Sequence, residues 1–207
     1  MEEGVIKFNI KELKKEKLDI DISDIEKIRE ELFKLKLIGF NKEQNLGYGN
    51  ISKRINEKEF IISGSQTGNL KNLKIMHYSL ITGVDFKTNS VFCKGLIEPS
   101  SESLTHAAFY TDKKYNAVIH IHNLKLWNHL IEDGYISTPE DAPYGSIKLW
   151  RSIFDILENN KYDNSLTIVM KGHKEGIVVA SSSLDDAMDE ILILCDKYNY
   201  KGETIDK

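Results

Sequence analysis

The sequence predicts an α/β fold in which a mixed β-sheet is covered by helices. Short runs rich in Val and Ile recur in pairs around turn residues, a pattern typical of β-hairpins. Longer segments with apolar residues at helical spacing lie between these hairpins and towards the end of the chain. The 207 residues are enough for one domain with a sizeable core. Hairpins and helices mixed in this order favour one sheet with helical cover.

The expected elements alternate along the chain without an internal repeat. Strands are expected at residues 5–10, 51–55, 59–63, 78–85, 90–93, 116–123, 166–170 and 177–180. Helices are expected at residues 23–37, 101–111, 124–132, 146–159 and 184–198. Ser23 and Ser183 are the expected caps of the first and last helices. The lysine-rich residues 11–17 are expected to form a solvated helix face or an arm.

The composition is that of an ordinary globular protein, with 41% hydrophobic and 29% charged residues. The net charge of −4 gives no sign of affinity for nucleic acid or for a membrane surface. No apolar run approaches the ~20 residues that span a bilayer, and the N-terminus lacks the pattern of a secretory signal. Cys93 and Cys195 are therefore expected to be reduced thiols in a cytoplasmic protein.

Two histidines interrupt the apolar run at residues 116–123. Residues two apart in a strand point to the same side, so His120 and His122 share one face with Val118. Two imidazoles side by side on a rigid apolar strand form half of a metal site. The alternative is a pair of polar residues on a half-buried strand, and a third ligand is needed to decide between these interpretations.

His173 is the best candidate for that third ligand. It lies in a turn between Gly172 and Gly176 that joins two expected strands, so the sheet could carry it next to His120. Enzyme zinc sites take three protein ligands and leave one position open. Surface or packing roles are expected for His77 and His129.

Residues 99–102, Pro-Ser-Ser-Glu, are expected to begin a helix that Ser100 or Ser101 caps. A helix start presents free N–H groups that suit an anion such as phosphate. Glu102 is expected in the first turn, with His106 on the same face either orienting the carboxylate or simply packing. The glycine-rich loops at residues 47–50 and 63–68 could bind an anion or serve only as hairpin turns.

In chain order, these motifs resemble the class II aldolase/adducin family. The resemblance rests on Gly49-Asn50-Ile51-Ser52, Ile62-Ser63-Gly64-Ser65, Pro99-Ser100-Ser101-Glu102 with His106, Val118-Ile119-His120-Ile121-His122 and Gly172-His173. It begins near Ser23, so residues 1–22 are expected to be an N-terminal extension and residues 23–207 the family domain. It implies a three-layer α/β/α fold with a mostly antiparallel central sheet. It also implies a homotetramer with active sites at subunit interfaces.

The resemblance assigns roles to the candidate residues. His120, His122 and His173 are the implied zinc ligands, although three imidazoles also suit Mn²⁺, Co²⁺ or Fe²⁺. Glu102 is the implied carboxylate that moves a proton during turnover. The implied phosphate-binding groups are Asn50, Ser100, Ser101 and one residue of the next loop, either Ser65, Gln66, Thr67 or Gly68, with Ser65 as the candidate.

The sequence departs from the family pattern in three places. The loop at residues 63–68 carries extra residues. Lys174 and Glu175 separate His173 from its glycine. The segment after the histidine strand is short, and Tyr135 and Tyr144 stand in no matching motif for the tyrosine that donates a proton in fuculose-phosphate aldolases.

The resemblance implies a metal-dependent lyase that cleaves a small phosphorylated ketose through a zinc-stabilised enediolate. Epimerisation or dehydration of a sugar phosphate on the same metal site is the first alternative. A non-catalytic, adducin-like oligomerisation domain is the second, and the three histidines with Glu102 argue against it. A barrel-type zinc hydrolase does not fit the hairpin order.

Overall fold

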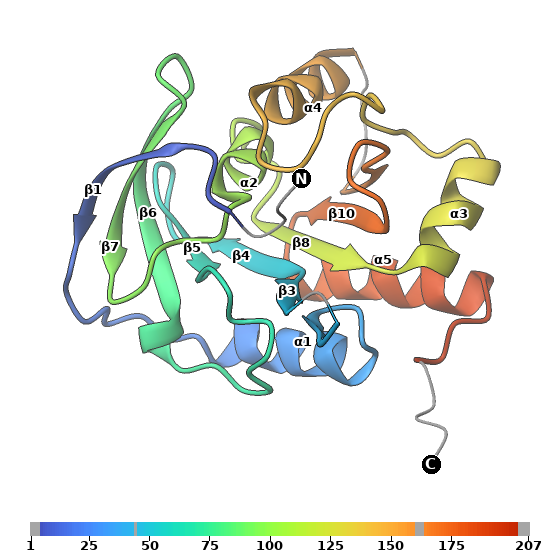
Figure 1. Cartoon of the computed structure of the whole chain (residues 1–207), viewed down its shortest axis with the longest axis horizontal. Helices are drawn as coiled ribbons and strands as arrows, with labels where there is room; N and C mark the ends of the chain where they lie inside the picture. Colours follow the sequence, from blue (N-terminus) through green and yellow to red (C-terminus); the bar gives the residue numbers. More distant parts are fainter. Residues whose placement is uncertain (1–4, 44, 160–163, 203–207) are drawn as a thin grey trace.

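The computed structural model describes residues 5–43, 45–159 and 164–202. Its central element is an eight-stranded mixed sheet (Figure 1). Across the sheet the strands are β1 (Asn9–Lys14), β7 (Ser90–Gly95), β6 (Tyr78–Asp85), β5 (Phe60–Ser63), β4 (Asn50–Arg54), β8 (Ala117–His122), β10 (Gly176–Ser181) and β9 (Ser165–Val169). Only β1 and β7 pair in parallel, and the other pairs are antiparallel. The expected α/β class and the mostly antiparallel sheet are confirmed.

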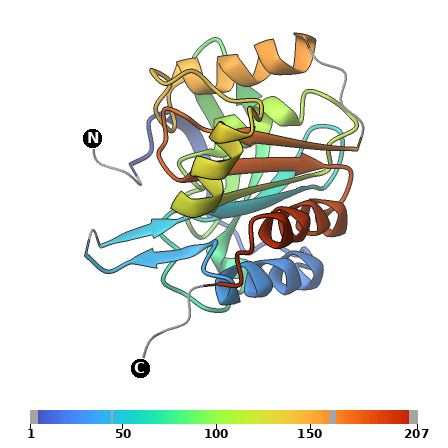
Figure 2. The ribbon, with the colours of Figure 1, turned by 90° about the vertical axis from the view of Figure 1, so that its right-hand side faces the viewer.

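Helices lie on both faces of this sheet (Figures 1 and 2). On one face are α1 (Ser23–Lys34), α3 (Leu124–Glu132) and α5 (Leu184–Lys197), and on the other are α2 (Ser103–Phe109) and α4 (Ile147–Asn159). Among the described residues, no helix has the length and apolar character that a membrane span requires.

The alternation of β8 divides the core into two parts. Ala117, Ile119 and Ile121 pack into the cluster under α1, α3 and α5. Val118 packs into the cluster under α2 and α4, on the face that also carries the histidines. Burying one such aliphatic side chain contributes about 1.5–3 kcal/mol, so a slip of one residue in the strand register would be strongly unfavourable.

The strand register around β8 positions the histidine site. In the β4–β8 pair, Asn50 lies opposite His120. In the β10–β8 pair, Gly176 lies opposite His122, so the turn that precedes β10 reaches over the end of β8. Residues from three distant parts of the chain therefore meet at one point of the sheet.

A short hairpin, β2 (Gly39–Asn41) with β3 (Leu46–Tyr48), was not expected from the sequence. Each strand has three residues, which is too short for an alternation pattern to be recognised. The chain then turns into β4 at Gly49, whose φ is +74°. A Cβ there would lie 2.6 Å from Ile38 and 3.0 Å from the His120 carbonyl oxygen, so this turn requires glycine.

The N-terminal segment departs from its expected structure. The strand expected at residues 5–10 is β1 (Asn9–Lys14), which runs into the lysine-rich stretch. β1 lies at the sheet edge, where charged side chains remain exposed while Ile10 and Leu13 pack inward. Because only one side of an edge strand is covered, the lysines do not prevent the strand from forming.

Candidate metal centre

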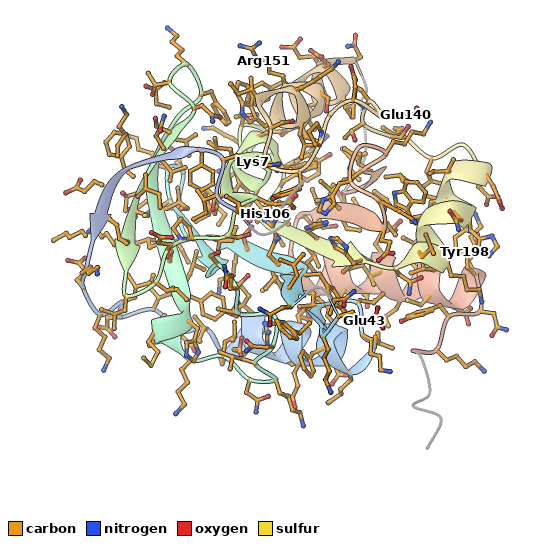
Figure 3. All side chains as sticks on the ribbon, viewed as in Figure 1. Lys7, Glu43, His106, Glu140, Arg151 and Tyr198 are labelled. Carbon is orange, nitrogen blue, oxygen red and sulfur yellow. The ribbon has the colours of Figure 1, made fainter. Side chains whose placement is uncertain are left out.

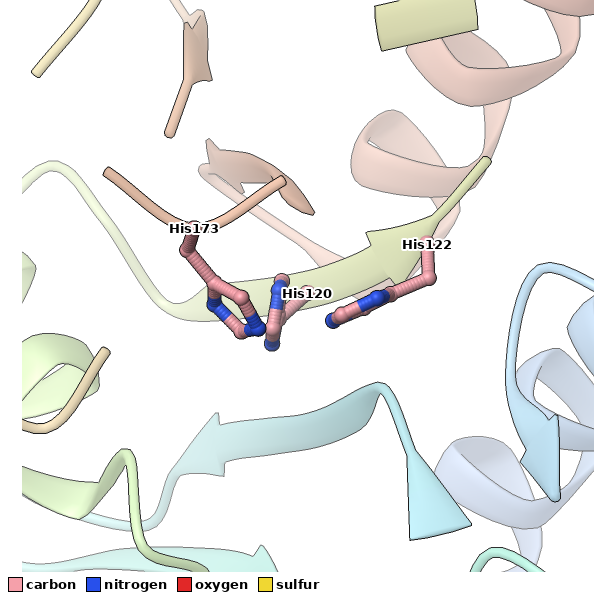
Figure 4. A group of neighbouring side chains, drawn as sticks. All are labelled: His120, His122 and His173. Carbon is pink, nitrogen blue, oxygen red and sulfur yellow. The ribbon is translucent and has the colours of Figure 1, made fainter. Parts of the chain in front are cut away.

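Three histidine side chains converge beside β8 (Figure 4). His120 and His122 project from β8, and His173 comes from the turn between β9 and β10. Their candidate ligand nitrogens all lie within 4.8 Å of one another. The ring centroids are 4.7 Å (His120–His122), 5.1 Å (His120–His173) and 4.6 Å (His122–His173) apart. The structure thus brings together the three histidines that the sequence singled out.

The turn that carries His173 packs tightly against the rest of the protein. A Cβ on Gly172 would lie 2.3 Å from the carbonyl oxygen of Ala142, so only glycine fits there. The His173 backbone N–H donates to the Met170 carbonyl oxygen at 3.0 Å. These contacts hold the imidazole over β8 despite the two residues that separate His173 from Gly176.

The surroundings of His122 favour a neutral imidazole. His120 and His173 are 1% and 6% exposed, and His122 is half-buried. Desolvation lowers the pKa of His122 well below its usual value, and the neighbouring His173 and His120 rings lower it further. A neutral imidazole is the form that binds a metal ion.

Glu102 lies next to these rings and is 2% exposed. Its carboxylate oxygens lie 2.6 Å from His120 Nδ1 and 3.4 Å from His173 Nδ1. Burial alone would raise the pKa of Glu102, but its interactions with His120 and His173 outweigh burial and hold the pKa well below its usual range. Glu102 is therefore an ionised carboxylate at neutral pH.

Two buried polar atoms at this point have no hydrogen-bond partner among the described residues. They are Asn50 Oδ1 and His120 Nε2. A buried polar atom without a partner costs about 1–3 kcal/mol. A divalent cation would supply the missing partner, and a set of imidazoles with a carboxylate suits zinc and its neighbours in the first transition series. The donor set therefore fits a metal ion.

The predicted phosphate-binding residues line one cleft with the histidines. Asn50, Ser65, Ser100 and Ser101 all contribute to its wall, together with Gln66, Thr67 and Gly68. Asn50 Nδ2 lies 3.3 Å from His120 Nδ1, so this amide is also close to the histidines that could bind a metal ion. The structure brings these predicted residues together, and their role in binding phosphate stays a prediction.

The helix after Pro99 begins later than expected. α2 starts at Ser103, so Glu102 occupies the N-cap position and does not lie in the first turn. Ser100 and Ser101 belong to the turn before the helix, where Ser100 Oγ accepts a hydrogen bond from the Glu102 N–H at 3.3 Å. The expected helix cap at these serines was wrong. The turn instead directs the Glu102 carboxylate towards His120.

A buried arginine supports the cleft wall from behind, and the sequence reasoning missed it. Arg29 on α1 is 1% exposed and donates to the carbonyl oxygens of Thr67, Leu70 and Lys71 at 3.2, 2.8 and 2.9 Å. Its position was detectable, because Arg29 continues the spacing of the buried Ile25 and Leu32. An arginine on the apolar stripe of a helix indicates a buried hydrogen-bonding role.

Two tyrosine rings flank the histidines. Tyr48 lies 5.6 Å from His122 and Tyr144 lies 5.3 Å from His173, and both line the cleft. Lys7 Nζ stands 3.7 Å from the centroid of the Tyr144 ring, on the same side of the sheet as α2 (Figure 3). Tyr135 instead packs with the cluster under α1 and α5. Of the two tyrosines considered from the sequence, Tyr144 is the one in the cleft.

Comparison with known proteins agrees with the motifs. Residues 35–128 match the sequence profile of the family described as Class II Aldolase and Adducin N-terminal domain. The resemblance to the class II aldolase/adducin family is confirmed. No functionally curated protein matches the sequence.

Solved structures related to this family share the fold. YgbL from Klebsiella pneumoniae, provisionally assigned as an aldolase, epimerase or decarboxylase, superposes with a TM-score of 0.60 at 16% identity over 84% of each chain. The L-fuculose-1-phosphate aldolase from Thermus thermophilus superposes with a TM-score of 0.56 at 17% identity, covering 86% of this chain and 90% of its own. At these identities the likeness is one of fold.

His106 and His129 lie outside the cluster of His120, His122 and His173. His106 is fully buried on α2 (Figure 3), and its Nδ1 lies 2.7 Å from Ser52 Oγ, which also contacts Tyr110 Oη at 2.7 Å. Burial lowers the pKa of His106 to about 3. These contacts favour packing over an orienting role towards Glu102. His129 stacks on Tyr198 near the surface, as expected.

Proposed function

We propose that the protein is a metal-dependent lyase that cleaves a small phosphorylated ketose by retro-aldol chemistry. One observation carries the proposal: three buried or half-buried histidines converge beside an ionised, buried Glu102 in a cleft with polar loops. A structural module would gain nothing from unpartnered buried groups, which cost stability. The family match to class II aldolases agrees with this chemistry.

His120, His122 and His173 would hold the metal ion, with Zn²⁺ as the first candidate and Mn²⁺, Co²⁺ or Fe²⁺ also compatible. When bound, the cation supplies Lewis acidity, which stabilises negative charge on the substrate oxygens as the C–C bond breaks. The buried surroundings strengthen that interaction because they exclude water.

Glu102 would move the proton. As an ionised carboxylate it accepts the proton of the substrate hydroxyl whose carbon becomes the leaving aldehyde, and it can return a proton to the other fragment. Its place at the start of α2, held by the turn at Ser100, keeps the carboxylate beside His120. Asn50, Ser65, Ser100 and Ser101 would bind the phosphate and so fix the position of the substrate carbonyl.

The assembly and domain boundaries belong to the same proposal. We infer a homotetramer with active sites at subunit interfaces, which light scattering on the purified protein tests directly. We also infer that residues 23–207 form the catalytic domain and residues 1–22 an extension of it. β1 of this extension completes the sheet edge beside β7, and removal of residues 1–22 tests whether the remaining domain folds.

Epimerisation or dehydration of a sugar phosphate would use the same donor set, because both reactions also develop negative charge next to a carbonyl. Product analysis separates these reactions, since only the lyase releases two carbon fragments. A non-catalytic, adducin-like role would give no turnover in any metal-loaded sample.

The test is turnover of a panel of 1-phosphorylated ketoses by zinc-loaded protein, with release of dihydroxyacetone phosphate as the readout. We expect Glu102→Gln to lower kcat by about 10²–10⁴-fold while the protein keeps its fold. Glu57→Gln is the matched control, because Glu57 is 79% exposed and far from the cleft. Full turnover by Glu102→Gln would contradict the proton-transfer role.

A further inference from the structure

A second cavity adjoins the candidate active site on the far side of His122. Leu46, Tyr48 and His122 line both the cleft and this cavity, so one extended ligand could occupy the two together. Residues of the β2–β3 hairpin and of the start of α3 line this cavity. The hairpin projects from the body of the molecule (Figure 2). None of the predicted phosphate-binding residues lines it.

The cavity has a net positive lining. Lys36 and Lys174 contribute cations and Glu175 contributes an anion. The cavity therefore carries one net positive charge next to the histidines that could bind a metal ion. One net positive charge matches a singly charged carboxylate, whereas a second phosphate would bring two negative charges.

Lys174 is the residue placed to meet such an anion. It is exposed, and it forms no ion pair with any residue that the structure describes. It stands with Glu175 in the two positions that separate His173 from its glycine. Glu175 has a φ of +72°, and its carbonyl oxygen accepts from the Asn123 N–H at 3.0 Å, which ties the turn to the start of α3. The lysine is therefore carried on an anchored turn beside His122.

We propose that this cavity binds a carboxylate at the end of the substrate opposite its phosphate, with Lys174 as the specificity-determining residue. The inference rests on the proposed function and narrows its substrate class to phosphorylated sugar acids. Two anionic ends would hold the chain across the histidine centre, with the phosphate on the polar loops and the carboxylate beside Lys174. Anchoring at both ends fixes which carbon lies over the histidines.

The experiment compares two unreactive ligands, 6-phosphogluconate and sorbitol 6-phosphate, by calorimetry on zinc-loaded protein. They have the same length and matching hydroxyl groups, and only the first carries a carboxylate. We expect wild-type protein to prefer 6-phosphogluconate, and we expect Lys174→Gln to reduce that preference by about three- to fivefold, as for one exposed charge pair. Raising the salt concentration should weaken the preference in the wild type.

Lys171→Gln is the matched control, because Lys171 lies in the same turn but lines neither cavity. It should leave the preference unchanged, whereas Glu175→Gln should increase it. An unchanged preference in Lys174→Gln, or no binding of either ligand, would overturn the inference. The measurement needs no turnover, so a failure of the lyase proposal appears separately as absent cleavage of ketose phosphates.

Discussion

Replacing Arg29 with methionine tests whether the buried arginine on α1 holds the wall of the cleft. Its guanidinium donates three hydrogen bonds to carbonyl oxygens of the loop that follows Gly64, at 2.8–3.2 Å. The same loop contributes Ser65 and Thr67 to the cleft. Methionine fills a similar volume but donates nothing, so the loop would lose its attachment to α1.

The expected loss of stability in Arg29→Met depends on how deeply each of these hydrogen bonds is buried. Losing a hydrogen bond that leaves a buried carbonyl unpaired costs about 1–3 kcal/mol. The bond to Thr67 lies between buried groups, whereas those to Leu70 and Lys71 are partly buried, so water can replace the last two in part. Removing the charge also relieves the desolvation of a buried guanidinium. We therefore expect a net loss of about 2–4 kcal/mol in the free energy of unfolding.

The assay is urea unfolding, combined with calorimetric binding of a phosphorylated ligand to the zinc-loaded protein. A loosened loop should weaken binding while the metal content stays stoichiometric. Arg29→Lys should recover only part of the loss, because an ammonium cannot reach three carbonyls in the guanidinium geometry. The control is Arg151→Met on the exposed side of α4 (Figure 3), expected to cost less than about 0.5 kcal/mol. Equal stability and binding in Arg29→Met and Arg151→Met would refute the reasoning.

Three further predictions concern the sheet and the histidines. Gly49→Ala should cost about 1–3 kcal/mol more than Gly134→Ala in urea unfolding, because both glycines have positive φ but only Gly49 has atoms within 4 Å of a new Cβ. The pKa of His106 is lowered to about 3, so its contribution to stability is complete above pH 6.5 and declines as the pH falls below it. His106→Asn should therefore reduce the slope of stability against pH between 6.5 and 4.5 by up to about 1.4 kcal/mol per pH unit, and an unchanged slope would contradict the assignment. His173→Ala should lower bound zinc below stoichiometric levels, measured by mass spectrometry, whereas His129→Ala should bind zinc like the wild type.

Local sequence patterns predicted the structure correctly in elements whose buried and exposed positions alternate with a regular period. The alternation in residues 116–123 predicted which side chains of β8 face each part of the core, and the two histidines lie on the predicted face. β6 (Tyr78–Asp85) and α3 (Leu124–Glu132) have the expected bounds, because turn residues or an asparagine cap mark their ends. His173 was identified because Gly172 and Gly176 place it in a turn that joins two apolar runs.

Other features depend on which distant segments meet. Glu102 was expected on a helix, but its contact with His120 arises because the turn before α2 packs beside β8. The hydrogen-bond partners of Arg29 lie about 40 residues further along the chain, so they could not be predicted from the sequence around Arg29. Tyr144 reaches the cleft only because its segment packs against the turn of His173.

The amino-acid sequence by itself therefore determined the α/β class, the resemblance to class II aldolases and the identity of the candidate metal ligands. These depend on periodicity and on residue types at short spacing, which are properties of one segment at a time. The tertiary structure alone decided how Glu102 and Tyr144 meet the histidines, how Arg29 supports the cleft wall and that a second, charged cavity opens beside His122. Such contacts join residues far apart in the chain, and their geometry follows from how the sheet and its covering helices pack.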